Sequence, residues 1–131
     1  MTDTNNRYSV IRVEGIPPTV NHYVKHTRLG IHYKTTRARS WEQKVALACR
    51  GVAPVYGKTF EIEITVMFGK GERGDWDNFG KVVCDPIAKC GMLRNVKTGK
   101  PMSDAHIKRG TVHLDRGEKS MTTIEIFGVN S

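Results

Sequence analysis

Apolar and polar side chains alternate most regularly over residues 59–68, where every second residue is large and apolar. The apolar positions are Phe60, Ile62, Ile64, Val66 and Phe68. Because successive side chains of a strand point to opposite faces, this pattern predicts a strand with one buried face. Residues 8–16 are rich in valine and isoleucine and predict an earlier strand, which a double proline ends. Residues 105–114 and 121–127 predict a closing strand pair joined by a polar turn.

The apolar spacing changes to steps of three and four over residues 37–50, which predicts a helix. The apolar stripe consists of Ala38, Trp41, Val45 and Ala48. We expect Trp41 in the core or at a dimer interface. Ser40 with Gln43 resembles a capping box, so the helix could also begin there.

A second helix is predicted over residues 77–89, and Pro86 conflicts with it. Proline has no N–H and disfavours the helical conformation of the residue before it, so we expect a kink or a break. Residues 19–36 predict a basic connection that contains a small hairpin with its turn at residues 29–30. Residues 94–103 predict a loop.

The predicted order is strand, helix, strand, helix, strand, strand, which is typical of a small α+β domain with a mixed or antiparallel sheet. The 131 residues fit a single domain spanning 1–131, with loose tails at 1–7 and 128–131. No apolar run approaches the roughly 18 residues of a membrane helix. The first residues also lack the pattern of a secretory signal.

The chain carries 21 lysine and arginine residues against 13 aspartate and glutamate residues, a formal net charge of +8. So strong a positive charge on a short chain favours a polyanionic partner, and nucleic acid is the first candidate. Net charge alone is weak support, since many basic proteins have no such partner.

The three cysteines, Cys49, Cys84 and Cys90, show no disulfide framework and no zinc spacing, so we expect reduced thiols in a cytoplasmic protein. His22 and His26 are four residues apart, a spacing that can bind a metal on a helix. The preceding prolines and the missing glutamate argue against a zinc site here. Phosphate contact or simple surface exposure is the better interpretation.

Three of the six aspartates, Asp75, Asp77 and Asp85, lie close together in this basic chain. Asp75 and Asp77 are two residues apart and point the same way in an extended segment. Lys81 is four residues from both Asp77 and Asp85, so a continuous helix places these three on one face. Such carboxylates suit Mg²⁺ or Mn²⁺, which can activate water at a phosphodiester. The alternative is that Asp77 caps the helix while Lys81 and Asp85 form a surface pair.

The run Asp75-x-Asp77-Asn78-x-x-Lys81-x-x-x-Asp85, followed by Asp104 before a strand, resembles the RusA family of Holliday junction resolvases. The N-terminal half agrees, with an early strand, Pro17-Pro18-x-x-Asn21-x-Tyr23, and a basic segment leading into a tryptophan-bearing helix. The resemblance covers roughly residues 8–127.

This resemblance implies a RusA-like fold and a small homodimeric endonuclease of the bacterial cytoplasm, which a phage or prophage could also encode. It implies symmetric cutting of four-way DNA junctions in recombination and repair, with Mg²⁺ or Mn²⁺. The family's metal ligands correspond to Asp75, Asp77 and Asp104, and its catalytic lysine to Lys81. Asp85 corresponds to a further acidic position with a supporting role.

Three features depart from the family pattern. The family often has two adjacent acids where this chain has Ser103 and Asp104, so only the second is kept. Residues 94–102 look like an insertion. Pro86 stands where a helix-compatible residue is expected. None of these departures removes a proposed metal ligand.

We expect cations of the N-terminal segment, and others beside the acids, to bind DNA phosphates. The predicted DNA-binding residues are Asn21, Tyr23, Lys25, Arg28, Lys34, Arg37, Arg39, Lys70 and Arg73. The alternatives are that each cation is a solvated surface charge and that Tyr23 and Tyr33 are packing residues. Two other functions stay open: a non-catalytic junction- or RNA-binding protein, and a metal-dependent flap or single-strand nuclease.

Overall fold

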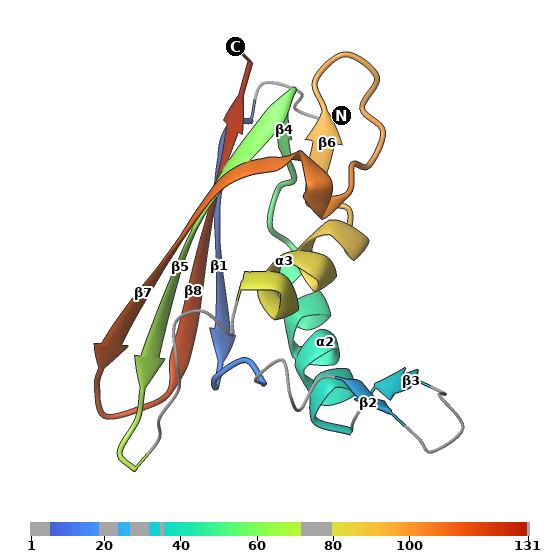
Figure 1. The fold of residues 1–131 in the computed structure, drawn as a ribbon. Helices are drawn as coiled ribbons and strands as arrows, with labels where there is room; N and C mark the ends of the chain where they lie inside the picture. Colours follow the sequence, from blue (N-terminus) through green and yellow to red (C-terminus); the bar gives the residue numbers. More distant parts are fainter. Residues whose placement is uncertain (1–5, 19–23, 27–31, 35, 72–79, 131) are drawn as a thin grey trace.

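The computed structural model describes residues 6–18, 24–26, 32–34, 36–71 and 80–130. Within them the chain forms a four-stranded sheet with two helices packed against one of its faces (Figure 1). This is a small α+β arrangement with a mixed sheet, as the sequence predicts.

The segment with the regular alternation forms β5 (Thr59–Phe68), an inner strand of the sheet. Its antiparallel neighbour is β8 (Met121–Val129), which also pairs with β1 (Tyr8–Glu14). Its parallel neighbour is β7 (Ile107–Arg116). The order across the sheet is therefore β1-β8-β5-β7. Because β8 runs to Val129, residues 128 and 129 belong to the sheet and not to a loose tail.

The two closing strands are not paired with each other, because β5 lies between β7 and β8. The turn that joins them crosses the end of β5, where the Gly117 N–H donates to the Phe68 carbonyl oxygen at 3.0 Å. The prediction of a closing pair is wrong. Strands that follow one another in sequence are usually neighbours, and here the crossing turn allows a different order.

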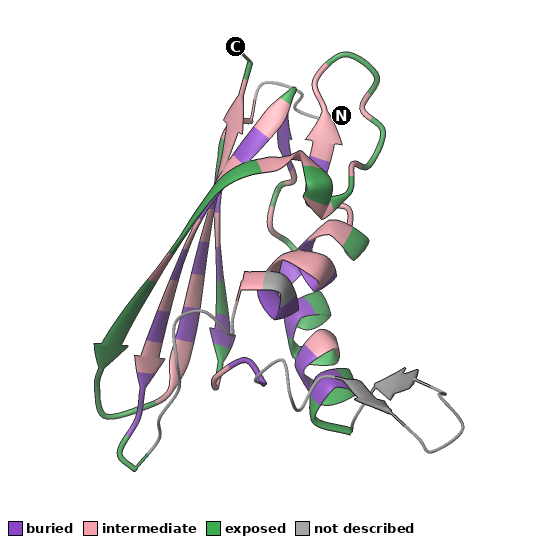
Figure 2. Cartoon of the chain, in the orientation of Figure 1, coloured by how far each residue is buried: buried purple, intermediate pink, exposed green. Residues whose placement is uncertain are grey.

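The two helices, α2 (Thr36–Cys49) and α3 (Gly80–Lys89), bury their apolar sides against the sheet (Figure 2). The predicted stripe of the first helix is confirmed, and its fully buried members are Ala38, Trp41 and Val45. Trp41 is 3% exposed and belongs to the core of this chain. Ser40 lies inside α2, so the alternative helix start at Ser40 is excluded.

Helix α3 continues through Pro86, so the expected break does not occur. A proline leaves the carbonyl four residues earlier without its helical donor, and in α3 that carbonyl belongs to Val82. The Trp41 Nε1–H donates to the Val82 oxygen at 3.0 Å in a buried position. Trp41 of α2 therefore supplies the hydrogen bond that Pro86 cannot make.

Two strands escape prediction because each has only three residues, too few to show an alternation. They are β4 (Val55–Gly57) and β6 (Leu93–Asn95), which pair in parallel beside the main sheet. The segment after β6, expected to be an inserted loop, is an organised turn. The Asn95 side-chain oxygen accepts the Lys97 and Thr98 N–H groups at 2.8 and 3.1 Å.

The small hairpin before the first helix is confirmed by β2 (Val24–His26) and β3 (His32–Lys34), which pair antiparallel. Because His26 lies in a strand, the helical spacing that could place His22 and His26 on one metal is excluded. His22 and the turn at 29–30 lie outside the described residues.

All three cysteines are free thiols. Cys49, at the end of α2, is buried and lies beside the exposed Cys90 that follows α3. Burial, and then the neighbouring Cys90 sulfur, raise the pKa of the Cys49 thiol. The ends of the two helices are thus in contact here, in addition to the bond from Trp41.

Trp41→Phe is expected to lower the free energy of unfolding by about 1–3 kcal/mol, because it leaves the Val82 oxygen buried without a donor. In a Pro86→Ala background the helix regains a backbone N–H that can donate to the Val82 oxygen. Trp41→Phe should therefore lower the free energy of unfolding by clearly less in that background. Urea denaturation of the four proteins in this double-mutant cycle measures the difference. An equal cost in both backgrounds would contradict the proposed compensation.

Native protein treated with a thiol reagent at about pH 8 is expected to react rapidly at Cys90, the exposed cysteine. Cys49 should react slowly, because it is buried and its raised pKa keeps it protonated at that pH. The measurement is the time course of release of the coloured thiol product. Cys90→Ser should remove the fast phase, and a fast phase that survives this change would contradict the prediction.

Candidate metal centre and DNA-binding surface

Two of the predicted metal ligands, Asp75 and Asp77, lie outside the described residues, in the segment between Gly71 and Gly80. Gly71 follows the end of β5, and Gly80 begins α3. Asp77 is three residues before Gly80, so its Cα lies within about 11 Å of the Gly80 Cα. The chain length alone therefore keeps Asp77 near the start of α3.

Asp104 belongs to a short 3₁₀ turn, η2 (Asp104–His106), directly before β7. This turn contacts α3, although the two elements are well separated in sequence. Asp104 is half-buried, and among the described residues its carboxylate takes part in no hydrogen bond or ion pair. A partly desolvated carboxylate usually has a partner, and none of the described residues supplies one to Asp104, so a bound ligand is a candidate.

The Cys84 thiol of α3 lies within electrostatic reach of two carboxylates. Burial, followed by the negative charges of Asp104 and Asp85, raises the pKa of Cys84 to about 12. Since the interaction between charges falls with distance, both carboxylates must lie near this part of α3. The fold thus brings Asp104 to the helix that carries Asp85.

Asp85 is paired within the fold. Its Oδ2 lies 3.2 Å from the Lys89 Nζ, and the same Nζ lies 3.8 Å from the Glu42 Oε2 on α2. This network joins the two helices and offsets part of the charge of Asp85. Lys81 is four residues before Asp85 in α3, so the helix backbone places the two residues on one face. The structure does not describe the Lys81 side chain itself. Because its carboxylate is already paired with Lys89, Asp85 is better suited to a supporting role than Asp104 is.

His106 is a further polar residue of η2 that sequence reasoning did not select. Its Nδ1 is buried and has no hydrogen-bond partner in the described part of the chain. An unpaired buried nitrogen costs about 1–3 kcal/mol, and such atoms call for an explanation. No sequence signal could have found it, because a single histidine before a strand is a common feature.

The described donors fit part of a magnesium site. Within residues 6–18, 36–71 and 80–130, no group of three or more histidine, cysteine, aspartate or glutamate side chains is placed to hold a metal ion. Asp104 nevertheless offers unpaired carboxylate oxygens, the type of donor that Mg²⁺ and Mn²⁺ prefer. Magnesium commonly keeps several waters and takes only one or two carboxylates. Asp104 with one aspartate of the 72–79 segment would therefore be sufficient.

The predicted DNA-binding residues are described only in part. Arg37 and Arg39 are exposed on the first turn of α2, and Lys70 is exposed just after β5. Lys25 and Lys34 lie in the hairpin strands β2 and β3, with their side chains outside the description. The remaining predicted contacts also lie outside the described residues: Asn21, Tyr23, Arg28 and Arg73.

Comparison of the chain with protein-family models and with curated proteins finds no match. The resemblance to the RusA family therefore rests on the motif residues themselves. In the part of the chain that the structure describes, no helix has the length and apolar character needed to cross a membrane.

Asp104→Asn is expected to leave the free energy of unfolding of the metal-free protein unchanged, or to raise it by up to about 1 kcal/mol. The reason is that it removes a half-buried, unpaired charge near Asp85. Asp85→Asn should instead lower it by less than about 1 kcal/mol, because it breaks the pair with Lys89. Urea denaturation with a chelator present compares the two variants. A large loss of stability in Asp104→Asn would indicate a structural role for Asp104.

Proposed function

We propose that this protein is a metal-dependent endonuclease that cuts branched DNA, with four-way junctions as its main substrate. The strongest support comes from η2, which carries Asp104 to α3, the helix that follows Asp75 and Asp77 in the chain. No described side chain pairs with the Asp104 carboxylate. The motif residues and the net charge of +8 add independent support. RusA-like architecture is part of the same proposal.

The proposed reaction is hydrolysis of a DNA phosphodiester. Asp75, Asp77 and Asp104 hold one or two divalent cations through their carboxylate oxygens. A bound cation supplies positive charge at the scissile phosphate and lowers the pKa of a water molecule. The water oxygen attacks phosphorus and the bond to the 3′ oxygen breaks, which leaves a 5′-phosphate and a 3′-hydroxyl that takes up a proton.

Residues of α3 assist in this scheme. Lys81, in the first turn, stabilises the negative charge that develops on the phosphate. Asp85 acts indirectly and does not hold the cation. Its pair with Lys89, together with the contact of Lys89 with Glu42, holds α3 against α2.

Paired cutting of a junction requires two active sites, and a two-fold homodimer supplies them most simply. Exposed cations such as Arg39 and Lys70 bind the DNA backbone, which gives affinity with little sequence preference. The bacterial cytoplasm is the proposed location, and the three free thiols fit a reducing compartment.

Asp75→Asn, Asp77→Asn and Asp104→Asn are each expected to slow cutting of a synthetic four-way junction in Mg²⁺ by about 100-fold or more. Junction binding, measured by gel shift with a chelator present, should be retained because the basic surface is unchanged. Asp115→Asn is the matched control, since Asp115 is an exposed aspartate of β7 that accepts a hydrogen bond from the Arg116 N–H.

Full cutting by all three variants would contradict the assigned metal site. Binding without cutting by the unaltered protein would favour a non-catalytic junction binder. Equal cutting of flaps, single strands and linear duplex would favour a general nuclease.

A further inference from the structure

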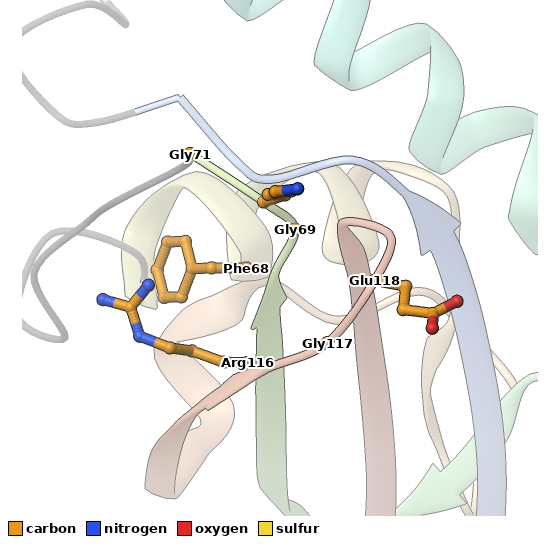
Figure 3. A pocket seen from close by; sticks show the side chains of 7 residues that line it. Phe68, Gly69, Gly71, Arg116, Gly117 and Glu118 are labelled. Carbon is orange, nitrogen blue, oxygen red and sulfur yellow. The ribbon is translucent and has the colours of Figure 1, made fainter.

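The end of β5 and the turn from β7 to β8 enclose a hollow of about 520 Å³ (Figure 3). Phe68 at the end of β5 and Lys70 after it line one side of the hollow. Arg116 at the end of β7 and Glu118 in the following turn line the other side. Glycines of both segments complete the wall. Arg116 belongs to no site assigned above. It lines the same hollow as Gly69 and Gly71, which precede the segment with Asp75 in the sequence.

Backbone contacts fix the walls of this hollow. The Gly117 N–H donates to the Phe68 oxygen at 3.0 Å, and the Gly69 N–H donates to the Ser120 hydroxyl at 3.0 Å. A Cβ on Gly69 would lie 2.9 Å from the Ser120 nitrogen, a separation that real side chains do not tolerate. The close approach of the two segments therefore requires glycine here, and the hollow is formed before any ligand arrives.

The chemistry of the hollow suits a phosphate group. Lys70 and Arg116 are both exposed and come from different segments, so two cations flank the same space. Phe68 is only 4% exposed and gives an apolar floor. The Glu118 carboxylate lies on the other side of Gly117 from the Arg116 guanidinium (Figure 3). Lysine and arginine bind phosphate oxygens through charge-assisted hydrogen bonds.

Chain length connects this hollow to the proposed metal ligands. Gly71 lies in its wall and Asp75 follows four residues later, so the two Cα atoms are at most about 14 Å apart. Along the axis of a DNA duplex each strand has one phosphate per about 3.4 Å, so this distance spans at most about four nucleotides. A phosphate in the hollow can therefore belong to the same DNA strand as a phosphate near Asp75, while Asp104 lies before the opposite end of β7.

We infer that the hollow binds a backbone phosphate of the DNA strand being cut, with Lys70 and Arg116 as its ligands. This inference rests on the proposed function. Lys70 and Arg116 then fix the position of the strand, while the acids carry out the cleavage.

The test measures binding of a fluorescent four-way junction, with a chelator present, over a series of salt concentrations. Lys70→Ala and Arg116→Ala should each lower the affinity about tenfold and reduce the slope of log affinity against log salt by about one. Arg116→Lys should restore most of the slope, because it keeps the charge. Lys58→Ala is the matched control, since Lys58 is an exposed cation at the opposite end of β5.

The cleavage reaction gives a second readout. With saturating junction and Mg²⁺, Arg116→Ala should cut within about threefold of the unaltered rate, while its KM rises about tenfold. If the unaltered protein binds junctions and both alanine variants bind as Lys58→Ala does, the inference is wrong and the proposed function stands. If the unaltered protein binds no DNA, the proposed function fails and the inference fails with it.

Discussion

The hydrogen bond from Trp41 to the Val82 oxygen is the interaction on which the candidate site depends. Helix α3 has ten residues, with a proline inside it, and so short a helix is marginal without tertiary support. Trp41 supplies the donor that Pro86 lacks and joins α3 to α2 at the same point. This contact helps to hold α3, which carries Asp85 and against which η2 packs, on α2.

The distribution of charge bears on the proposed DNA-binding surface. Glu63 of β5 stands directly opposite Glu125 of β8 on the sheet face that the helices leave uncovered. Like charges in this position destabilise a sheet. The Tyr8 hydroxyl offsets part of this repulsion by donating to Glu125 at 2.8 Å. On the same face Arg109 lies 3.9 Å from a third glutamate, Glu61. This acidic face would repel a phosphate backbone, so the proposed DNA-binding surface lies on the helix side and at the turns at the end of β5.

Local pattern was sufficient to predict the long elements and insufficient to predict their partners. The alternation over β5 and the stripe over α2 depend on which side chains are buried, and burial is visible in the sequence. The three-residue strands β4 and β6 are defined by hydrogen bonds with each other and leave no such pattern. Pro86 was correctly seen as a conflict, but its resolution required Trp41, which is distant in sequence. His106 was missed for a similar reason, because its significance comes from burial without a partner.

The strand pairing that sequence could not predict is the one that brings Asp104 to α3. Strand β7 lies parallel to β5, with Ile107 opposite Phe60, so β7 begins beside the start of β5. The turn η2 immediately precedes β7 and therefore lies at the end of the sheet where it contacts α3. An antiparallel β7 would instead have put Asp104 near Lys70 at the end of β5 and Arg116 near the start of β5. The parallel pairing thus separates a carboxylate suited to a cation from cations suited to a phosphate. The segment with Asp75 and Asp77 joins the two in sequence.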